Sequence, residues 1–216
     1  MIKAVLFDLD GTLVNSIKDL ADSTNFALAS MGFPTHEIEK FRYFVGDGMI
    51  MLIKRALPEE NRDEATVEKC HKIFREYYAQ HYLDSTYAYE GIKELLLSLK
   101  QKGYKTAVIS NKVDEMAKIV TDKIFGDIFD AVVGKKPNYP AKPDAKLTLE
   151  VISDLKVKSE ECAFVGDSGM DMQTAVNSGS VAVGVLWGFR ERKELEECGA
   201  IHIIEKPCQL LEVLEI

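Results

Sequence analysis

Residues 5–14 read VLFDLDGTLV, an apolar run that breaks into two acids two positions apart and then a Gly-Thr pair. The apolar β-formers from Ala4 to Phe7 predict a buried strand. Since side chains alternate along a strand, Asp8 and Asp10 are expected on the same side of it. Two carboxylates about 4 Å apart repel each other by roughly 1 kcal/mol in water and by roughly 4 kcal/mol at an effective dielectric of about 20. Folding gains nothing from this repulsion, so the stretch indicates a site with a compensating cation or a shared proton.

Two other structures can be weighed for the same stretch. One is a strand that runs into an ordinary Asp-Gly turn, which is what most lone Asp-Gly pairs form. The other is an EF-hand loop, which needs a third acid before the glycine and a Glu six residues after it. Leu6 and Ile17 stand at those two positions, so an EF-hand is disfavoured, and the turn stays open on these residues alone.

Composition limits the class of protein. The chain has 216 residues, 46% of them apolar, which is enough for one sizeable core with or without a smaller unit. Its net charge of −8, without a basic block, argues against non-specific nucleic-acid binding, because phosphate neutralisation needs clustered Lys and Arg. The four cysteines are scattered without a Cys-x-x-Cys pair, so neither a disulfide framework nor a zinc site is expected. A strand directly at the N-terminus is not expected to be a signal peptide, and no apolar stretch approaches the length of a membrane span, so a reducing cytoplasm fits best.

Alternating strands and helices after residue 90 predict a parallel sheet with helices on both faces, an α/β, Rossmann-like core. The first strand has no partner near it in sequence and is expected to join this sheet. The expected strands are 105–110, 130–133, 162–166, 181–186 and 201–204, and the expected helices are 91–102, 112–121, 144–154, 170–178 and 191–197.

The residues between the first strand and this core are expected to be helical. Ser16 can cap a helix over 17–31, and residues 36–83 contain no strand-like run and carry apolar side chains at helical spacing. The sequence therefore predicts two domains, a core of residues 1–14 and 86–216 and an inserted all-helical domain of residues 15–85.

Polar residues follow three of the expected strands at the point where each strand ends, and in open parallel sheets this edge is where ligands bind. These residues are Asp8 and Asp10, then Ser110 and Asn111, then Asp167 and Asp171. Carboxylates without a histidine or thiol favour a hard divalent cation such as Mg²⁺, which also binds water and phosphate oxygens. Ser110 and Asn111, at an expected helix N-terminus, offer donors to phosphate oxygens, and Lys142 can supply positive charge.

These residues resemble the motifs of the haloacid dehalogenase superfamily, in the phosphatase branch that carries a helical C1-type cap after the first strand. The motifs read DLDGT at 8–12, Ser110-Asn111, Lys142-Pro143 and GDSGMD at 166–171, and the likeness covers nearly the whole chain. Their order and spacing together make the resemblance specific. It implies that residues 1–14 and 86–216 form the catalytic core, and that residues 15–85 form a cap that closes over the site and excludes bulk water.

The resemblance also implies a role for each motif residue. Asp8 would be the nucleophile that forms an aspartyl-phosphate, and Asp10 would be the general acid and then the general base, with its main-chain carbonyl on the metal. An Asp with an ordinary pKa of about 3.9 is ionised at neutral pH, which suits the nucleophile. The implied metal ligands are Asp8, Asp10 and Asp167, with Asp171 as a further ligand or a support behind them. The implied phosphate-binding residues are Ser110, Asn111 and Lys142.

Two lysines compete for the phosphate-binding position. The family's lysine motif commonly has a second proline two positions after the first, where this chain has Ala145. Lys136-Pro137 offers a rival six residues before Lys142. Lys142 is preferred because a helical pattern starts directly after it.

Segments of the helical domain resemble one particular group within this family. The segments FVGDG at 44–48 and LIKRAL at 52–57 resemble phosphoglycolate phosphatases, as do residues 10–16, except that Asn15 stands where an Asp is common. Gly46, Gly48 and Arg55 are therefore candidates for substrate specificity, although an ordinary helix N-terminus accounts equally well for the two glycines. The segment Trp187–Arg190 follows an expected strand and either borders the site or anchors a loop.

The resemblance implies a Mg²⁺-dependent phosphoric monoester hydrolase that acts on small phosphate monoesters, with phosphoglycolate as the best single substrate. The alternatives are a pyrophosphatase or nucleotidase of the same branch, and a phosphosugar mutase of the β-phosphoglucomutase type. A non-catalytic phospholigand-binding module is disfavoured because Asp8, Asp10, Lys142 and Asp167 are all present. The expected partner is a small phosphorylated metabolite, with no nucleic acid and no membrane, and the expected state is a cytoplasmic monomer or homodimer.

Overall fold

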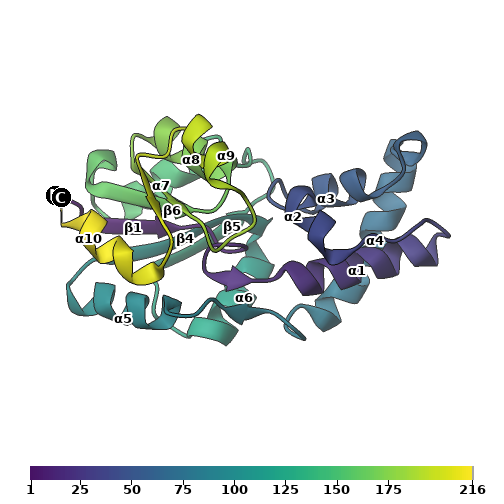
Figure 1. Ribbon diagram of the computed structural model, residues 1–216, viewed down its shortest axis with the longest axis horizontal. Coiled ribbons are helices and arrows are strands. Elements are labelled where there is room, and N and C mark those ends of the chain that lie inside the picture. Colours follow the sequence, from purple (N-terminus) through teal and green to yellow (C-terminus); the bar gives the residue numbers. More distant parts are fainter. Residues whose placement is uncertain (216) are drawn as a thin grey trace. The chain divides into compact units, whose positions relative to one another are not determined.

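The computed structural model describes residues 1–215, and Ile216, the last residue of the expected core range, lies outside them. The chain divides into two compact units, Met1–Val14 with the chain from Ala88 on, and Asn15–Tyr87. It passes from one unit to the other within the short strands β2 (Val14–Asn15) and β3 (Tyr87–Ala88). The first unit contains the large sheet and the second consists of helices, as the labelled helices and strands in Figure 1 show.

The first unit is built on a six-stranded parallel sheet. β1 (Ala4–Phe7) lies between two strands that come much later in the chain, with Phe7 opposite Val108 on one side and Val165 on the other. The first strand therefore joins the later sheet, as predicted. In spatial order the strands are β5 (Ala131–Lys135), β4 (Lys105–Val113), β1, β6 (Cys162–Gly166), β7 (Val181–Val185) and β8 (His202–Ile204).

Helices cover both faces of this sheet, and the two helices before and after β4 lie on the face opposite to the three that connect β5 to β8 (Figure 1). This arrangement confirms the predicted Rossmann-like α/β architecture. The helices of this unit are α5 (Ile92–Gln101), α6 (Asp114–Phe125), α7 (Lys146–Asp154), α8 (Gly169–Ser178), α9 (Arg192–Glu197) and α10 (Leu210–Leu214).

The core beneath the α7 and α8 face is formed by strand residues that point to one side of the sheet. Leu6, Ile109 and Phe164 come from three adjacent strands and pack with Val151 and Met172 from the covering helices. All five are buried. Burial of such a side chain contributes about 1.5–3 kcal/mol, so a few of them outweigh the repulsion between acids at the ends of the same strands.

The strand after α5 is longer than predicted, and this changes where two candidate residues lie. The strand expected at 105–110 runs on to Val113, and the helix expected from residue 112 begins at Asp114. A register shift between Ile109 and Val113 lets β4 keep pairing with β5. Ser110 and Asn111 therefore lie inside a strand and not at a helix N-terminus. That prediction was wrong because an irregularity of this kind leaves no mark on the apolar pattern.

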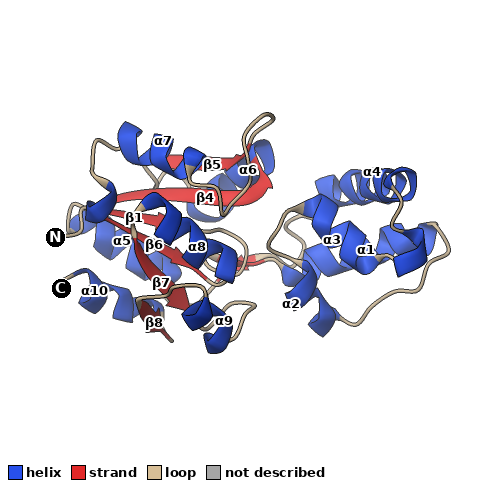
Figure 2. Cartoon of the chain, turned by 90° about the horizontal axis from the view of Figure 1, so that it is seen from above, coloured by secondary structure: helices blue, strands red, loops and turns tan. Residues whose placement is uncertain are grey.

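The second unit is helical (Figure 2). α1 packs along α4, where the rings of Phe26 and Tyr77 stack with their centroids 4.1 Å apart. Ser16 precedes α1, but its side chain makes no capping hydrogen bond, contrary to the prediction; Asn15 Oδ1 instead accepts one from the Ile17 main-chain N–H at 3.3 Å. The helices are α1 (Ile17–Ser30), α2 (Phe41–Phe44), α3 (Met49–Ala56) and α4 (Glu64–His81), with 3₁₀ turns at Ile38–Lys40 and Glu59–Asn61.

Candidate functional site

Three of the predicted acids meet at the carboxyl edge of the sheet. Asp8 follows β1, Asp167 follows β6, and Asp171 stands in the first turn of α8. The Asp8 main-chain N–H donates to the Val165 carbonyl at 2.9 Å, which continues the pairing of β1 with β6 up to the acids. One carboxylate oxygen from each acid lies within 4.8 Å of the others, and all three side chains are buried. The sheet thus brings Asp8 together with two acids that lie 159 and 163 positions further along the chain.

Lys142 reaches the same cluster from the loop between β5 and α7. Its ammonium nitrogen lies 2.7 Å from Asp8 Oδ1 and 2.6 Å from Asp171 Oδ1, and the side chain is 5% exposed. The rival Lys136 lies elsewhere, with its nitrogen 5.8 Å from the centroid of the Tyr139 ring. Of the two competing lysines, the structure therefore brings Lys142 to the acids.

Ser110 and Asn111 lie in the second half of β4, the other neighbour of β1. Asn111 Oδ1 accepts a hydrogen bond from the Lys142 main-chain N–H at 2.9 Å, and Asn111 Nδ2 donates to the Lys142 carbonyl at 3.5 Å. Ser110 Oγ accepts from the Lys112 main-chain N–H at 3.2 Å. Asn111 thus holds the backbone that carries the Lys142 ammonium, and a direct role of either side chain in phosphate binding stays a prediction.

Asp10 is not part of the three-acid cluster through its side chain. Its two carboxylate oxygens lie 3.2 and 3.1 Å from the ammonium nitrogen of Lys112, whose side chain is 2% exposed. The sequence motifs assign no role to Lys112. The available signal was its position directly after Ser110-Asn111, at the end of a strand that borders β1.

Asp167 is held by one motif residue, Thr12, and by a segment that the motifs do not include. Thr12 Oγ1 donates to Asp167 Oδ1 at 3.1 Å, and the Phe189 main-chain N–H donates to Asp167 Oδ2 at 2.8 Å. The Trp187 indole N–H in turn donates to the Thr12 carbonyl at 2.9 Å. The segment Trp187–Arg190 therefore borders the site through its main chain and one indole, and the signal for it was its place after β7.

Asp171 has a supporting arrangement of its own. Its Oδ2 accepts hydrogen bonds from the main-chain N–H of Ser168 at 3.0 Å and from the Ser168 hydroxyl at 2.6 Å, at the N-terminus of α8. Its other oxygen faces Lys142. Both carboxylate oxygens are thus committed to fixed partners, which suits the predicted supporting role and leaves direct ligation as a prediction.

Burial decides the protonation of this cluster in the absence of a cation. Burial raises the pKa of Asp8 to about 7, although Lys142 opposes the rise, and Asp171 adds to it. The ordinary pKa expected for Asp8 from the sequence is therefore wrong for the metal-free site, because that expectation did not include burial. Burial likewise raises the pKa of Asp167 to about 8, with further contributions from Asp171 and Asp8. For Lys142, burial by itself favours the neutral amine, but the carboxylates of Asp171 and Asp8 outweigh it and raise the pKa.

These values test whether a metal ion fits the site. Asp8 and Asp167 retain protons near neutral pH because ionising them in this buried site costs free energy. The positive charge of Lys142 alone does not offset that cost. The candidate ligands offer oxygen only, and hard divalent cations prefer carboxylate oxygen. The donor set of Asp8, Asp167 and Asp171 therefore fits a hard divalent cation.

The three specificity candidates lie in the helical unit, with Gly46 and Gly48 just before α3 and Arg55 in its last turn. Arg55 Nη1 donates to the Phe44 carbonyl at 3.0 Å, and Arg55 Nη2 pairs with the Asp47 carboxylate. Gly46 and Gly48 both have positive φ, 124° and 87°, so the loop between α2 and α3 needs glycine there. The Arg55 guanidinium thus holds this loop, and a role of the three residues in specificity stays a prediction.

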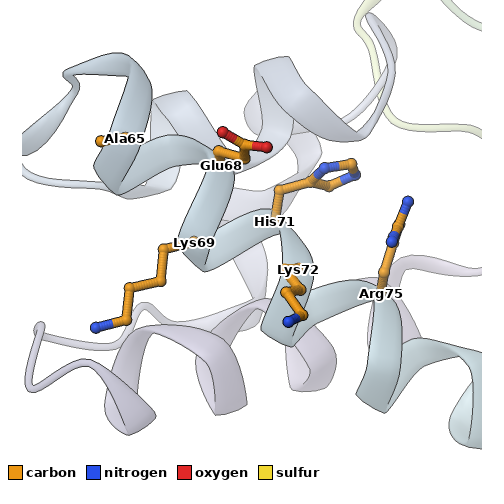
Figure 3. A pocket seen from close by; sticks show the side chains of 6 residues that line it. All are labelled: Ala65, Glu68, Lys69, His71, Lys72 and Arg75. Atoms are coloured by element: carbon orange, nitrogen blue, oxygen red, sulfur yellow. The ribbon is translucent and has the colours of Figure 1, made fainter.

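A surface hollow on α4 contains none of the predicted site residues. Figure 3 shows its lining side chains pointing in different directions, with Lys69 and Arg75 extending away from each other. No set of donors converges on one point there. The lining residues are Ala65, Glu68, Lys69, His71, Lys72 and Arg75.

None of the helices in residues 1–215 combines the length and apolar character needed to cross a membrane.

Comparison with known proteins places this geometry in context. The family model described as haloacid dehalogenase-like hydrolase matches residues 5–185. The chain is 34% identical to the phosphoglycolate phosphatase of Chromobacterium violaceum over 198 residues, which cover 90% of this chain and 89% of that one. It is 31% identical to the phosphoglycolate phosphatase of Vibrio parahaemolyticus over 227 residues, 100% of this chain and 97% of the relative. A crystal structure of a protein from Lactobacillus delbrueckii subsp. bulgaricus, proposed to be a phosphoglycolate phosphatase, superposes with a TM-score of 0.93 at 31% identity and covers 98% of both chains.

Proposed function

The chain belongs to the haloacid dehalogenase-like hydrolase family, as a phosphatase of small phosphate monoesters, and we propose that its substrate is phosphoglycolate and its cofactor Mg²⁺. The two curated relatives named above carry the substrate assignment. The proposed metal ligands are Asp8, Asp167 and the main-chain carbonyl of Asp10, with Asp171 behind them. A small phosphorylated metabolite is the partner that this activity requires, while a cytoplasmic location and a monomer or homodimer stay predictions.

One observation supports this chemistry most directly. Asp8 is a buried carboxylate at the carboxyl edge of the sheet, 2.7 Å from the Lys142 ammonium and close to Asp167. Folding alone does not favour such a cluster, because each buried carboxylate loses its hydration. Such a cluster suits a site that binds a cation together with a dianionic phosphate. The cation would offset the negative charge of the carboxylates and of the phosphate.

We assign the two steps to Asp8 and Asp10. An Asp8 carboxylate oxygen bonds to phosphorus while the bond from phosphorus to the ester oxygen breaks, and Asp10 gives that oxygen its proton, so the alcohol leaves neutral. Water then attacks phosphorus as Asp10 takes its proton, and the bond from phosphorus to Asp8 breaks. Inorganic phosphate leaves and the Asp8 carboxylate is restored.

Positive charge at the site comes from two sources in this proposal. The Lys142 ammonium already touches Asp8 and is positioned to contact a phosphoryl oxygen bound there. When bound, Mg²⁺ would supply the additional charge that lets a phosphate dianion approach the three carboxylates. Electrostatic stabilisation of this kind is usually the largest contribution to such reactions.

The test is a comparison of substrates with the purified protein in Mg²⁺. We expect kcat/KM to be highest for phosphoglycolate in a panel of phosphate monoesters that also contains pyrophosphate and nucleoside monophosphates. We expect the Asp8→Asn variant to lose turnover on every substrate in the panel. Its thermal unfolding should still show a cooperative transition, which would show that the variant is folded. Hydrolysis by Asp8→Asn at the wild-type rate would refute the nucleophile. Preference for pyrophosphate or a nucleotide, or isomerisation of glucose 1-phosphate without phosphate release, would refute the substrate assignment.

A further inference from the structure

The segment Trp187–Phe189, which follows β7, contacts the candidate metal site from a part of the chain that the motifs do not cover. Its main-chain N–H at Phe189 donates to Asp167 Oδ2 at 2.8 Å. Its indole at Trp187 donates to the Thr12 carbonyl at 2.9 Å, and the Thr12 hydroxyl donates to Asp167 Oδ1 at 3.1 Å. Each oxygen of the Asp167 carboxylate is therefore fixed by a donor that this segment either supplies or holds in place.

Gly188, in the middle of the segment, lies against the Asp167 side chain and the main-chain oxygen of Gly11. A Cβ on Gly188 would overlap the Asp167 side chain and come too close to the main-chain oxygen of Gly11. The Gly188 backbone itself does not have positive φ, so the reason for glycine here is space and not conformation. Any side chain at this position would have to push Asp167 away.

Arg190, the residue directly after the segment, is tied to α9 and through it to α8. Arg190 Nε lies 3.3 Å from Glu194 Oε2, and Glu194 Oε1 accepts a hydrogen bond from the Gly169 main-chain N–H at 2.9 Å. Gly169 is the first residue of α8, two positions after Asp167. The Arg190 guanidinium, with a side chain 11% exposed, is therefore engaged in holding the loop.

We propose that Trp187, Gly188 and the Phe189 main-chain amide position the Asp167 carboxylate for the divalent cation and so set the affinity of the site for metal. This inference rests on the proposed function. A carboxylate oxygen has two lone pairs, so one hydrogen bond on each oxygen orients Asp167 and still leaves a lone pair for a cation. Groups that orient a metal ligand in this way typically change metal affinity by about 10- to 100-fold when they are removed.

The experiment measures metal binding directly. Trp187 is the only tryptophan in the chain, so its fluorescence reports on this segment. We expect Mg²⁺ added to metal-free wild-type protein to change the Trp187 emission with the same Kd that isothermal titration calorimetry gives. By calorimetry, Gly188→Ala is expected to raise the Kd for Mg²⁺ by about 10- to 100-fold and Trp187→Phe, which keeps an aromatic ring without the N–H, by about tenfold. With Mg²⁺ at saturation, kcat of Trp187→Phe should return to within about threefold of wild type.

Lys193→Gln serves as the matched control on α9, because its side chain is 81% exposed and lies beyond the segment. We expect it to bind Mg²⁺ with the wild-type Kd. Wild-type affinity in both Trp187→Phe and folded Gly188→Ala would overturn the positioning role and leave the proposed function standing. If Gly188→Ala does not fold, Trp187→Phe alone decides. Wild-type protein that binds neither Mg²⁺ nor Mn²⁺ would instead overturn the proposed function, and this inference with it.

Discussion

The ammonium nitrogen of Lys112 lies 3.2 and 3.1 Å from the two carboxylate oxygens of Asp10. The Lys112 side chain is 2% exposed and that of Asp10 14%, so this ion pair is largely shielded from water. A contact to both oxygens restricts rotation of the carboxylate as well as neutralising it. Lys112 thus fixes the direction in which the proposed general acid presents its oxygens.

The Lys112→Met variant tests this positioning. We expect kcat to fall by about 10- to 100-fold with little change in KM, because a misplaced proton donor slows chemistry and not binding. The measurement is steady-state kinetics on an alkyl phosphate and on p-nitrophenyl phosphate. The defect should be larger for the alkyl ester, whose leaving group needs the proton. An equal loss on both esters would contradict a role through Asp10.

Lys142 and Lys136 give a second, paired prediction. Lys142→Met removes the ammonium that lies within 2.7 Å of Asp8 and 2.6 Å of Asp171, so kcat/KM should fall by about 100- to 1000-fold. Lys136→Met should stay within about twofold of wild type, because that lysine lies beside Tyr139. Both variants should be assayed at saturating Mg²⁺ after a check of thermal unfolding. The reverse ranking would show that the wrong lysine was chosen.

The raised pKa of Asp167 predicts how the stability of the metal-free protein depends on pH. Between the ordinary pKa of 3.8 and the folded value of about 8, the folded state retains a proton that the unfolded chain has lost. The free energy of unfolding therefore falls as pH rises through this interval, and the loss is complete above it.

Asp167→Asn should remove this contribution. An amide can accept from the Phe189 N–H and donate to the Thr12 hydroxyl, so the geometry at the site can be kept. In EDTA we expect the variant to exceed wild type by roughly 1–3 kcal/mol at pH 8 to 9, and the difference to shrink towards pH 5. Urea unfolding at each pH measures this. If the free energy of unfolding changed with pH in the same way for the variant and for wild type, the raised pKa of Asp167 would be contradicted.

A fourth prediction concerns the helical unit. Asp19 is buried in α1, and its carboxylate accepts hydrogen bonds from the main-chain N–H groups of Ser85 and Thr86 and from the Thr86 hydroxyl, at 2.7 to 3.1 Å. Asp19→Asn would turn an NH₂ group towards these donors. We expect the variant to lose roughly 1–3 kcal/mol of stability in urea unfolding.

Asp22→Asn is the matched control for this change. Asp22 lies on the same helix with a side chain 54% exposed and pairs with the exposed Lys18. We expect its effect to stay within about 0.5 kcal/mol. Equal effects of the two substitutions would show that the Asp19 contacts contribute no more than a surface pair.

The site residues that could be predicted are those that come directly after a strand in the chain. Asp8 and Asp167 come directly after short apolar strands, and in a parallel sheet such ends share one edge, so their meeting was predictable. The helical pattern after Pro143 favours Lys142 over Lys136, although the helix starts only at Lys146. Lys112 was not predicted because its reach to Asp10 depends on the register shift in β4, which extends the strand past Asn111.

The sequence by itself determined the architecture and the chemistry of the acids, because hydrophobic periodicity and the spacing of the carboxylates are local properties of the chain. Only the tertiary structure decided how those acids are held. The Asp10 and Lys112 ion pair, the Asn111 support behind Lys142, and the contact of Trp187–Phe189 with Asp167 all join residues at least 22 positions apart. Hydrogen bonds of this kind depend on distances of a few tenths of an ångström between separate strands, and packing of the whole sheet sets those distances.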